Sequence, residues 1–260
     1  MTQTLRVMQS IVTGLLMTGC AGVGSSTINP EEVPISAAPI STQCVADRAT
    51  INLNDQEIED IQLVLAQMEE EDQVSRMMVK LPTFNRENAV KARALTIGID
   101  EIATYREAVR EVKSRYGEEL SETQLKRLKA IRLATDETNT RRLLSLIMTY
   151  GWPSKERSQS EVSPVVFLLH MSPTEFEALT PLLLCEVKQG RMAAKNFANG
   201  HDKAAKIRGD YVLYGVGQDF DPVAGKMLPP IIESKLLTDK ARAEIGLDSI
   251  ESFRLAAATP

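Results

Sequence analysis

The sequence predicts a mostly α-helical fold, a multi-helix orthogonal bundle. Apolar residues recur at spacings of three and four along most of the chain, which is the helical period. Side chains typical of helix starts and glycines typical of helix ends divide this pattern into segments. The 260 residues are 43% hydrophobic and 25% charged, enough for one core of ordinary size. No repeat with a period of about 20–50 residues suggests a solenoid instead.

The N-terminal residues predict a secretory signal. Arg6 is followed by an apolar run at 11–17 and then by small residues that lead to Cys20. The run LMTGC at 16–20 resembles the lipobox of bacterial lipoproteins, in which the cysteine is acylated and becomes the first mature residue. The resemblance implies a bilayer anchor at Cys20 and, from Ala21 after it, an outer-membrane destination facing the periplasm. The alternative is an ordinary cleaved signal with a chance cysteine.

The next segment, 20–50, is rich in Gly, Ser, Thr and Pro and predicts a flexible tether. The domain organisation is therefore a signal at 1–19, this tether, and one helical domain at 51–256. In an oxidising compartment a disulfide between Cys44 and Cys185 is permitted, although no sequence pattern places the two cysteines close together.

The helical domain is expected to begin after Asn54, a good N-cap, and its first helix should run to about Lys80. A second helical stretch is expected at 86–116, and a third begins after Ser121. Both have heavily charged faces, so the inserted helices at about 84–134 are expected to form a solvated arm or packing layer. An oligomer contact is the alternative.

Six further elements follow in order. Asp136 is expected to cap a helix that stops before the Gly-Trp-Pro turn at 151–153. A short apolar helix is expected at 160–171, then a helix that Ser172-Pro173 starts and Gly190 ends, then one at about 192–208 that ends at Gly209. Residues 210–230 predict a small β-hairpin or an ordered loop. The last short helix is expected from about 238 to 246.

Several polar residues lie where the pattern predicts core. Asp72 continues the apolar stripe of the first helix, and Arg76 one turn later predicts a partly buried ion pair. His170 lies on an otherwise hydrophobic helix face, which is typical of a core histidine and, less often, of a catalytic one. His201 and Asp202 together with His170 match no metal motif of fixed spacing, so no metal site is predicted.

Composition and motifs exclude several function classes. The 30 basic and 35 acidic residues are interspersed and give a net charge of -5, which does not favour nucleic-acid binding. The chain has no G-x-S-x-G elbow, no H-E-x-x-H, no phosphate-binding glycine loop and no C-x-x-C. No cofactor is predicted. A Ser/His/Asp site stays open, because triads are recognised by geometry.

The order and spacing of the polar residues resemble domain-of-unknown-function family 6624. The match runs from about 58 to 253 and is interrupted by the inserted helices at 84–134. It includes the Gly-Trp-Pro turn, His170 at the end of an apolar helix, and Tyr214-Gly215, but it departs from the family after Gly209. The resemblance implies no activity, only that these residues recur together: Asp72, Gln73, Arg76, Asp136, Asn139, His170, Asp202 and Lys203.

Two hypotheses of function follow. The first is a non-catalytic lipoprotein module that binds an envelope protein through its helical surface. The second is a hydrolase-like or anionic-ligand-binding pocket built on His170 and Asp202, in which Asp72, Arg76 and Lys203 position an anionic group. The two differ in one spatial expectation. The second requires His170 and Asp202 to lie within hydrogen-bond reach of each other in a concave, water-accessible site, and it loses support if both are sealed in the core.

Overall fold

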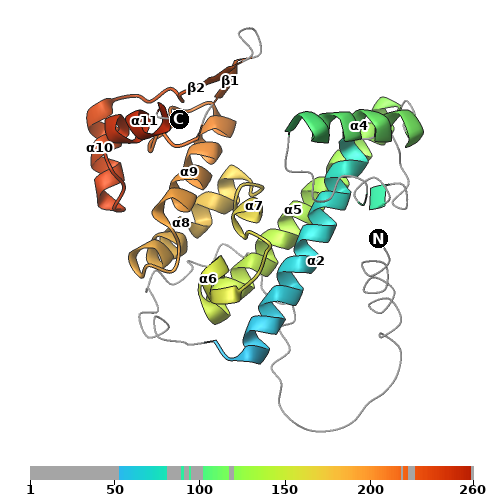
Figure 1. Ribbon diagram of the computed structural model, residues 1–260, viewed down its shortest axis with the longest axis horizontal. Coiled ribbons are helices and arrows are strands. Elements are labelled where there is room, and N and C mark those ends of the chain that lie inside the picture. The colour runs from blue at the N-terminus through green and yellow to red at the C-terminus, as the bar shows by residue number, and fades with distance from the viewer. Residues whose placement is uncertain are drawn as a thin grey trace.

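The computed structural model describes residues 53–80, 89–90, 94, 102–116, 120–217, 219–221 and 226–258 (Figure 1). These residues are mostly α-helical, which confirms the predicted fold class. The principal helices are α2 (Asp55–Lys80), α4 (Ile102–Tyr116), α5 (Glu122–Tyr150), α8 (Pro173–Lys188), α9 (Ala194–Arg208), α10 (Lys235–Glu244) and α11 (Ile250–Ala258). Two single-turn helices, α6 (Lys155–Ser158) and α7 (Val165–Leu168), join α5 to α8.

The two longest helices, α2 and α5, lie side by side and antiparallel (Figure 1). Both start at the residues that the sequence indicates, because Asn54 accepts the backbone N–H of Glu57 and Ser121 forms a reciprocal capping box with Gln124. The apolar stripe of α2, which includes Ile61 and Leu65, packs into the main core. A smaller second cluster lies where the C-terminal end of α2 meets the start of α5.

The structure corrects the prediction that Asp136 caps a separate helix. Asp136 lies inside α5, which continues unbroken for 29 residues, from Glu122 after the Ser121 cap to Tyr150 before the turn at Gly151. Asp favours caps only as a weak preference, and no glycine or proline interrupts this stretch, so helical hydrogen bonding continues through it. The helix does end where predicted, since Gly151 has φ 77, a left-handed value that favours glycine.

The segment after that turn is less helical than predicted. The apolar helix expected at 160–171 is reduced to the four residues of α7. The turn itself is held by Glu186, whose Oε2 accepts the backbone N–H of Trp152 at 2.7 Å and pairs with Arg191 at 2.6 Å. Arg157 donates to the carbonyls of Tyr150 and Trp152. This buried ionic network fixes the turn without a regular element.

Helices α8 and α9 pack against each other and against α7. Ser172 and Glu175 form the capping box of α8, as the Ser-Pro pair predicted, and Gly209 ends α9 with φ 83. Gly200 allows the close approach of these helices, because a Cβ there would overlap the ring of Phe176. Cys185 lies on α8 and is disulfide-bonded.

The C-terminal part forms a small layer beside α9 (Figure 1). Strands β1 (Asp219–Asp221) and β2 (Lys226–Leu228) pair antiparallel, with Phe220 opposite Met227. Helix α10 begins three residues earlier than predicted, at an N-cap formed by Ser234, and α11 follows it. Gly246 follows α10 with φ 79.

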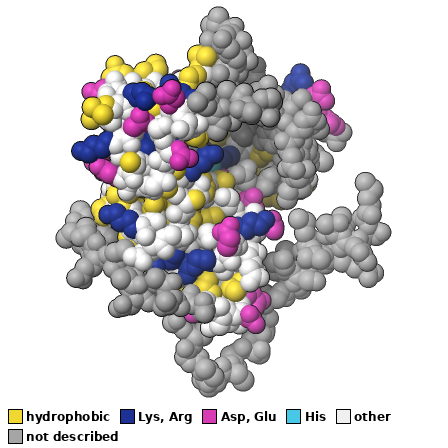
Figure 2. All heavy atoms as spheres, turned by 60° about the vertical axis from the view of Figure 1, so that its left-hand side comes forward, with side chains coloured by type: hydrophobic (Ala, Val, Ile, Leu, Met, Phe, Trp, Pro, Cys, Tyr) yellow, Lys and Arg dark blue, Asp and Glu magenta, His cyan; other side chains and the backbone are white. Residues whose placement is uncertain are grey.

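The surface carries mixed charge. On the face that Figure 2 shows, acidic and basic side chains are interspersed and hydrophobic side chains reach the surface between them. Within the described ranges, none of the helices combines the length and the apolar character needed to cross a bilayer.

Candidate functional site

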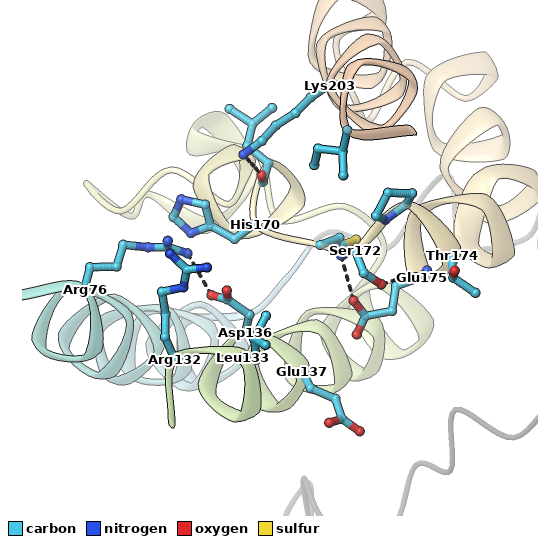
Figure 3. A pocket seen from close by; sticks show the side chains of 14 residues that line it. Arg76, Arg132, Leu133, Asp136, Glu137, His170, Ser172, Thr174, Glu175 and Lys203 are labelled. Carbon is cyan, nitrogen blue, oxygen red and sulfur yellow. Dashed lines mark hydrogen bonds and ion pairs between the residues drawn. The ribbon is translucent and has the colours of Figure 1, made fainter. Parts of the chain in front are cut away.

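A cavity of about 710 Å³ opens between the α2–α5 pair and the segment from α7 to α9 (Figure 3). Its wall includes Arg76 of α2, Arg132 and Asp136 of α5, His170 after α7, and Lys203 of α9. The first turn of α8 closes one side. Ionisable groups from four segments therefore converge on one concave surface, which is typical of ligand-binding and catalytic sites.

The buried carboxylate of Asp72 organises this wall. Its oxygens accept Arg76 Nε at 3.0 and 3.1 Å and Gln73 Nε2 at 2.9 Å. Its side chain is 1% exposed, so these partners replace water around a charge that burial would otherwise penalise. The predicted ion pair between Asp72 and Arg76 is confirmed.

His170 is the third side-chain partner of the Asp72 carboxylate. Its Nδ1 lies 2.8 Å from Asp72 Oδ1, and its side chain remains 20% exposed. Since Asp72 acts as an acceptor toward both Gln73 and Arg76, we assign the Nδ1 proton to His170 as the donor of this bond. The neutral ring then has its lone pair on Nε2, the tautomer that accepts a proton. His170 is therefore an oriented base at the cavity wall.

Arg76 links this pair to α5. Its NH2 group binds Asp136 Oδ1 at 2.7 Å while its Nε binds Asp72. Burial is the largest influence on Asp136 and raises the pKa of its carboxyl, against the opposing effects of the positive charge on Arg76 and of His170. The guanidinium thus spans two carboxylates and is largely neutralised by them.

Lys203 enters the cavity from the opposite side (Figure 3). Its Nζ donates to the backbone carbonyl of Leu169. Burial and the positive charge of Arg76 lower the pKa of Lys203, with a further lowering from Arg132 and a partial offset from Asp136. No acidic side chain is within ion-pair distance of its ammonium group among the described residues.

Other residues of the predicted set have structural roles. Asn139 Nδ2 donates to the carbonyl of Met68 and joins α5 to α2, away from the cavity wall. Asp202 accepts the backbone N–H groups of Leu213, Tyr214 and Val216 at 3.1, 2.9 and 2.8 Å. It is 1% exposed. The structure therefore replaces Asp202 with Asp72 as the carboxylate that pairs with His170.

Sequence reasoning missed Arg132. It precedes Asp136 by one helical turn, so the two side chains project from the same face of α5 into the cavity (Figure 3). The assumption of a helix break at Asp136 concealed this relation. Glu186 and Arg191, which no pattern singled out, form the buried network at the Gly-Trp-Pro turn.

Three of these groups could hold a metal ion. Ligand atoms of Asp72, Asp136 and His170 all lie within 4.8 Å of one another. In this arrangement the guanidinium of Arg76 already bonds to both carboxylates, so it supplies the positive charge that an ion would bring.

Comparisons with protein-family models, with curated proteins and with solved structures give no match to this chain. The resemblance to family 6624 therefore stays a prediction. Cys20 and Cys44 lie outside the described residues, so the lipid anchor and the pairing of Cys44 with Cys185 also stay predictions.

Proposed function

We propose that this chain is a lipid-anchored envelope protein whose helical domain carries a hydrolase-like acid–base site. The proposal depends on one observation, the 2.8 Å bond between the buried carboxylate of Asp72 and Nδ1 of His170 at the wall of an open cavity. A carboxylate in this place orients the imidazole and stabilises the imidazolium that forms when Nε2 accepts a proton.

The chemistry follows from the orientation of the ring. Nε2 takes a proton from a bound water, the water oxygen bonds to the electrophilic atom of the ligand, and the departing group leaves with the returned proton. Asp72 is a positioning residue in this scheme, because its oxygens are occupied by Arg76, Gln73 and His170.

The test is hydrolysis of chromogenic esters, p-nitrophenyl acetate and p-nitrophenyl phosphate, by the wild type and His170→Gln. We expect the substitution to lower kcat/KM by about 10²-fold or more on the ester that is cleaved, the usual contribution of a general base. His201→Gln is the matched control, since the chain has two histidines and His201 lies among the rings of Phe176, Phe197 and Tyr214. Equal rates for the wild type and His170→Gln refute the site.

The lipid anchor is tested separately. Acylation of Cys20 predicts that Cys20→Ser moves the protein from the membrane fraction to the soluble fraction, while Cys44→Ser stays with the membrane. Continued membrane association of Cys20→Ser would contradict acylation of Cys20. It would have no bearing on the proposed acid–base site.

A second candidate function is a non-catalytic module that binds another envelope protein. Large apolar side chains are exposed among the described residues of 207–237, and four of them are more than half exposed: Ile207 at 57%, Tyr211 at 61%, Ile231 at 71% and Leu236 at 79%. Such exposure is typical of a contact surface when the residues are contiguous. A photo-crosslinker at Ile231 that captures a discrete envelope protein, together with unchanged hydrolysis in His170→Gln, favours this function over the first.

A further inference from the structure

Two cationic side chains of the cavity wall form no ion pair with a carboxylate of the described residues. Asp136 is bound by Arg76, and Glu175 is occupied by the backbone N–H of Ser172 at 2.8 Å. Glu137 also lines the cavity, and in Figure 3 its carboxylate points away from Arg132 and Lys203. Arg132 and Lys203 are left as the cationic groups of the wall without an acidic partner among the described residues.

Arg132 is the more unusual of the two. Within the described part of the chain its guanidinium makes no hydrogen bond or ion pair, and its Nε is buried without a partner. Its side chain rises from α5 and ends near Arg76 and Asp136 (Figure 3). A guanidinium with five N–H donors, one of them buried without an acceptor, is a costly arrangement unless an anion accepts from it.

We infer that the cavity binds the phosphate group of a small organic phosphate ester, held between Arg132 and Lys203. This rests on the proposed function, since it names the ligand class of the same cavity. The planar fork of Arg and the point charge of Lys are the two side-chain types that proteins use for phosphate. A phosphate group near pH 7 carries about -1.5 to -2 and three acceptor oxygens, so it can bond to both side chains at once more strongly than a singly charged carboxylate does.

The remaining space indicates an ester and not the bare ion. A cavity of about 710 Å³ is within the range of pockets that hold small organic ligands, about 300–1,000 Å³. With the phosphate bound between Arg132 and Lys203, the organic group can lie along the apolar side chains of Leu133, Met171 and Ile207, which line the same cavity.

The test is calorimetric titration of the full-length protein with phenyl phosphate and, separately, with benzoate at equal ionic strength. We expect phenyl phosphate to bind at least tenfold more tightly than benzoate. Arg132→Gln and Lys203→Gln should each weaken phenyl phosphate binding by tenfold or more. Lys129→Gln, which removes the same charge from an exposed position on α5 outside the cavity, should change the dissociation constant less than twofold.

A folding defect is separated from a loss of binding by thermal unfolding. Arg132→Gln removes no hydrogen bond within the described residues, so it should unfold at or above the wild-type temperature. Tighter binding of benzoate, or equal phenyl phosphate binding by Arg132→Gln and wild type, overturns the inference. Phosphate binding that needs Arg132, without any hydrolysis that needs His170, leaves the inference standing and refutes the proposed function. Hydrolysis that needs His170 but not Arg132 supports the proposed function and refutes the phosphate site between Arg132 and Lys203.

Discussion

Two buried carboxylates illustrate how side-chain surroundings separate a reactive group from a structural one. Asp72 and Asp202 are equally inaccessible, yet Asp72 accepts from side chains at a cavity and Asp202 accepts from backbone N–H groups. The three bonds of Asp202 hold the loop that follows α9 onto the core. Its role is therefore that of a cap for a loop, and its loss should act on stability.

We predict that Asp202→Asn lowers the free energy of unfolding by about 3 kcal/mol. An amide offers one acceptor oxygen and turns its NH2 group toward backbone donors, so at least one charge-assisted bond is lost and one N–H is left unpaired. Urea unfolding followed by circular dichroism measures the change. Asp210→Asn, at a carboxylate 57% exposed on the surface, should cost less than about 0.5 kcal/mol. A loss below 1 kcal/mol at Asp202 contradicts the capping role.

The buried phenol of Tyr214 should make the free energy of unfolding fall at alkaline pH. Burial, with the nearby charge of Asp202, raises the pKa of its phenol from 10.0 to about 12. Between these values the folded chain keeps a proton that the unfolded chain has released, so stability falls as pH rises above 10. Tyr214→Phe should remove about 1 kcal/mol of the loss between pH 9 and pH 11, measured by urea unfolding at each pH. Tyr211→Phe, at a largely exposed ring, should retain the wild-type loss. Identical pH profiles for wild type and Tyr214→Phe argue against a protected phenol.

At the scale of elements, the local signals of helix ends were more dependable than the positions of breaks. Asn54, Ser121 and Ser172 each start a helix as predicted, because a side-chain oxygen at an N-cap satisfies a free N–H whatever the tertiary context. The weak cap preference of Asp and the lack of a glycine or proline in this stretch permit Asp136 to lie either at a cap or inside a helix, and packing of α5 on α2 together with its bond to Arg76 selects the interior position. That information is absent from local sequence.

The continuity of α5 predicts a glycine penalty at Ala134. This residue is exposed and lies within the uninterrupted helix, so Ala134→Gly should cost about 1 kcal/mol through backbone entropy alone. Ala193→Gly is the control, because Ala193 is the extended N-cap of α9, where glycine is tolerated. Chemical unfolding of both variants gives the comparison. A negligible cost at Ala134 would indicate a break in the helix near Asp136.

The candidate site was partly predictable, because contacts within one helix follow from local spacing and contacts between distant segments do not. Asp72 and Arg76 were found from their one-turn spacing on an apolar stripe, and their ion pair follows from helix geometry. The partner of His170 was not predictable, since it lies 98 positions away and only the packed fold brings the two together. Lys203 was predicted through the family resemblance. Arg132 was not predicted, because its one-turn spacing from Asp136 has meaning only if both residues lie in the same helix.

At the scale of the whole molecule, Cys185 of α8 is disulfide-bonded. We predict that its partner is Cys44, since the lipobox resemblance assigns Cys20 to acylation. Cys44→Ala should then expose one thiol on Cys185 and lower the free energy of unfolding by about 3–5 kcal/mol, because a long loop is no longer closed in the unfolded chain.

Maleimide labelling of the denatured, unreduced protein measures that pairing. The wild type should take up no label, and Cys44→Ala should take up one. Cys20→Ser, which removes the acylated residue, should remain unlabelled. Label on the unreduced wild type rules out the pairing.

The cavity wall combines side chains from segments as distant in sequence as α2 and α9. An occupant would therefore tie the α2–α5 pair to the α7–α9 segment as a non-covalent cross-link. At a ligand concentration of about 100 times its dissociation constant, occupancy adds about 2.7 kcal/mol to the free energy of opening, which is about a hundredfold fewer opened molecules. Where proteases cleave only opened chains, an occupied cavity therefore slows proteolysis and lengthens the lifetime of the protein.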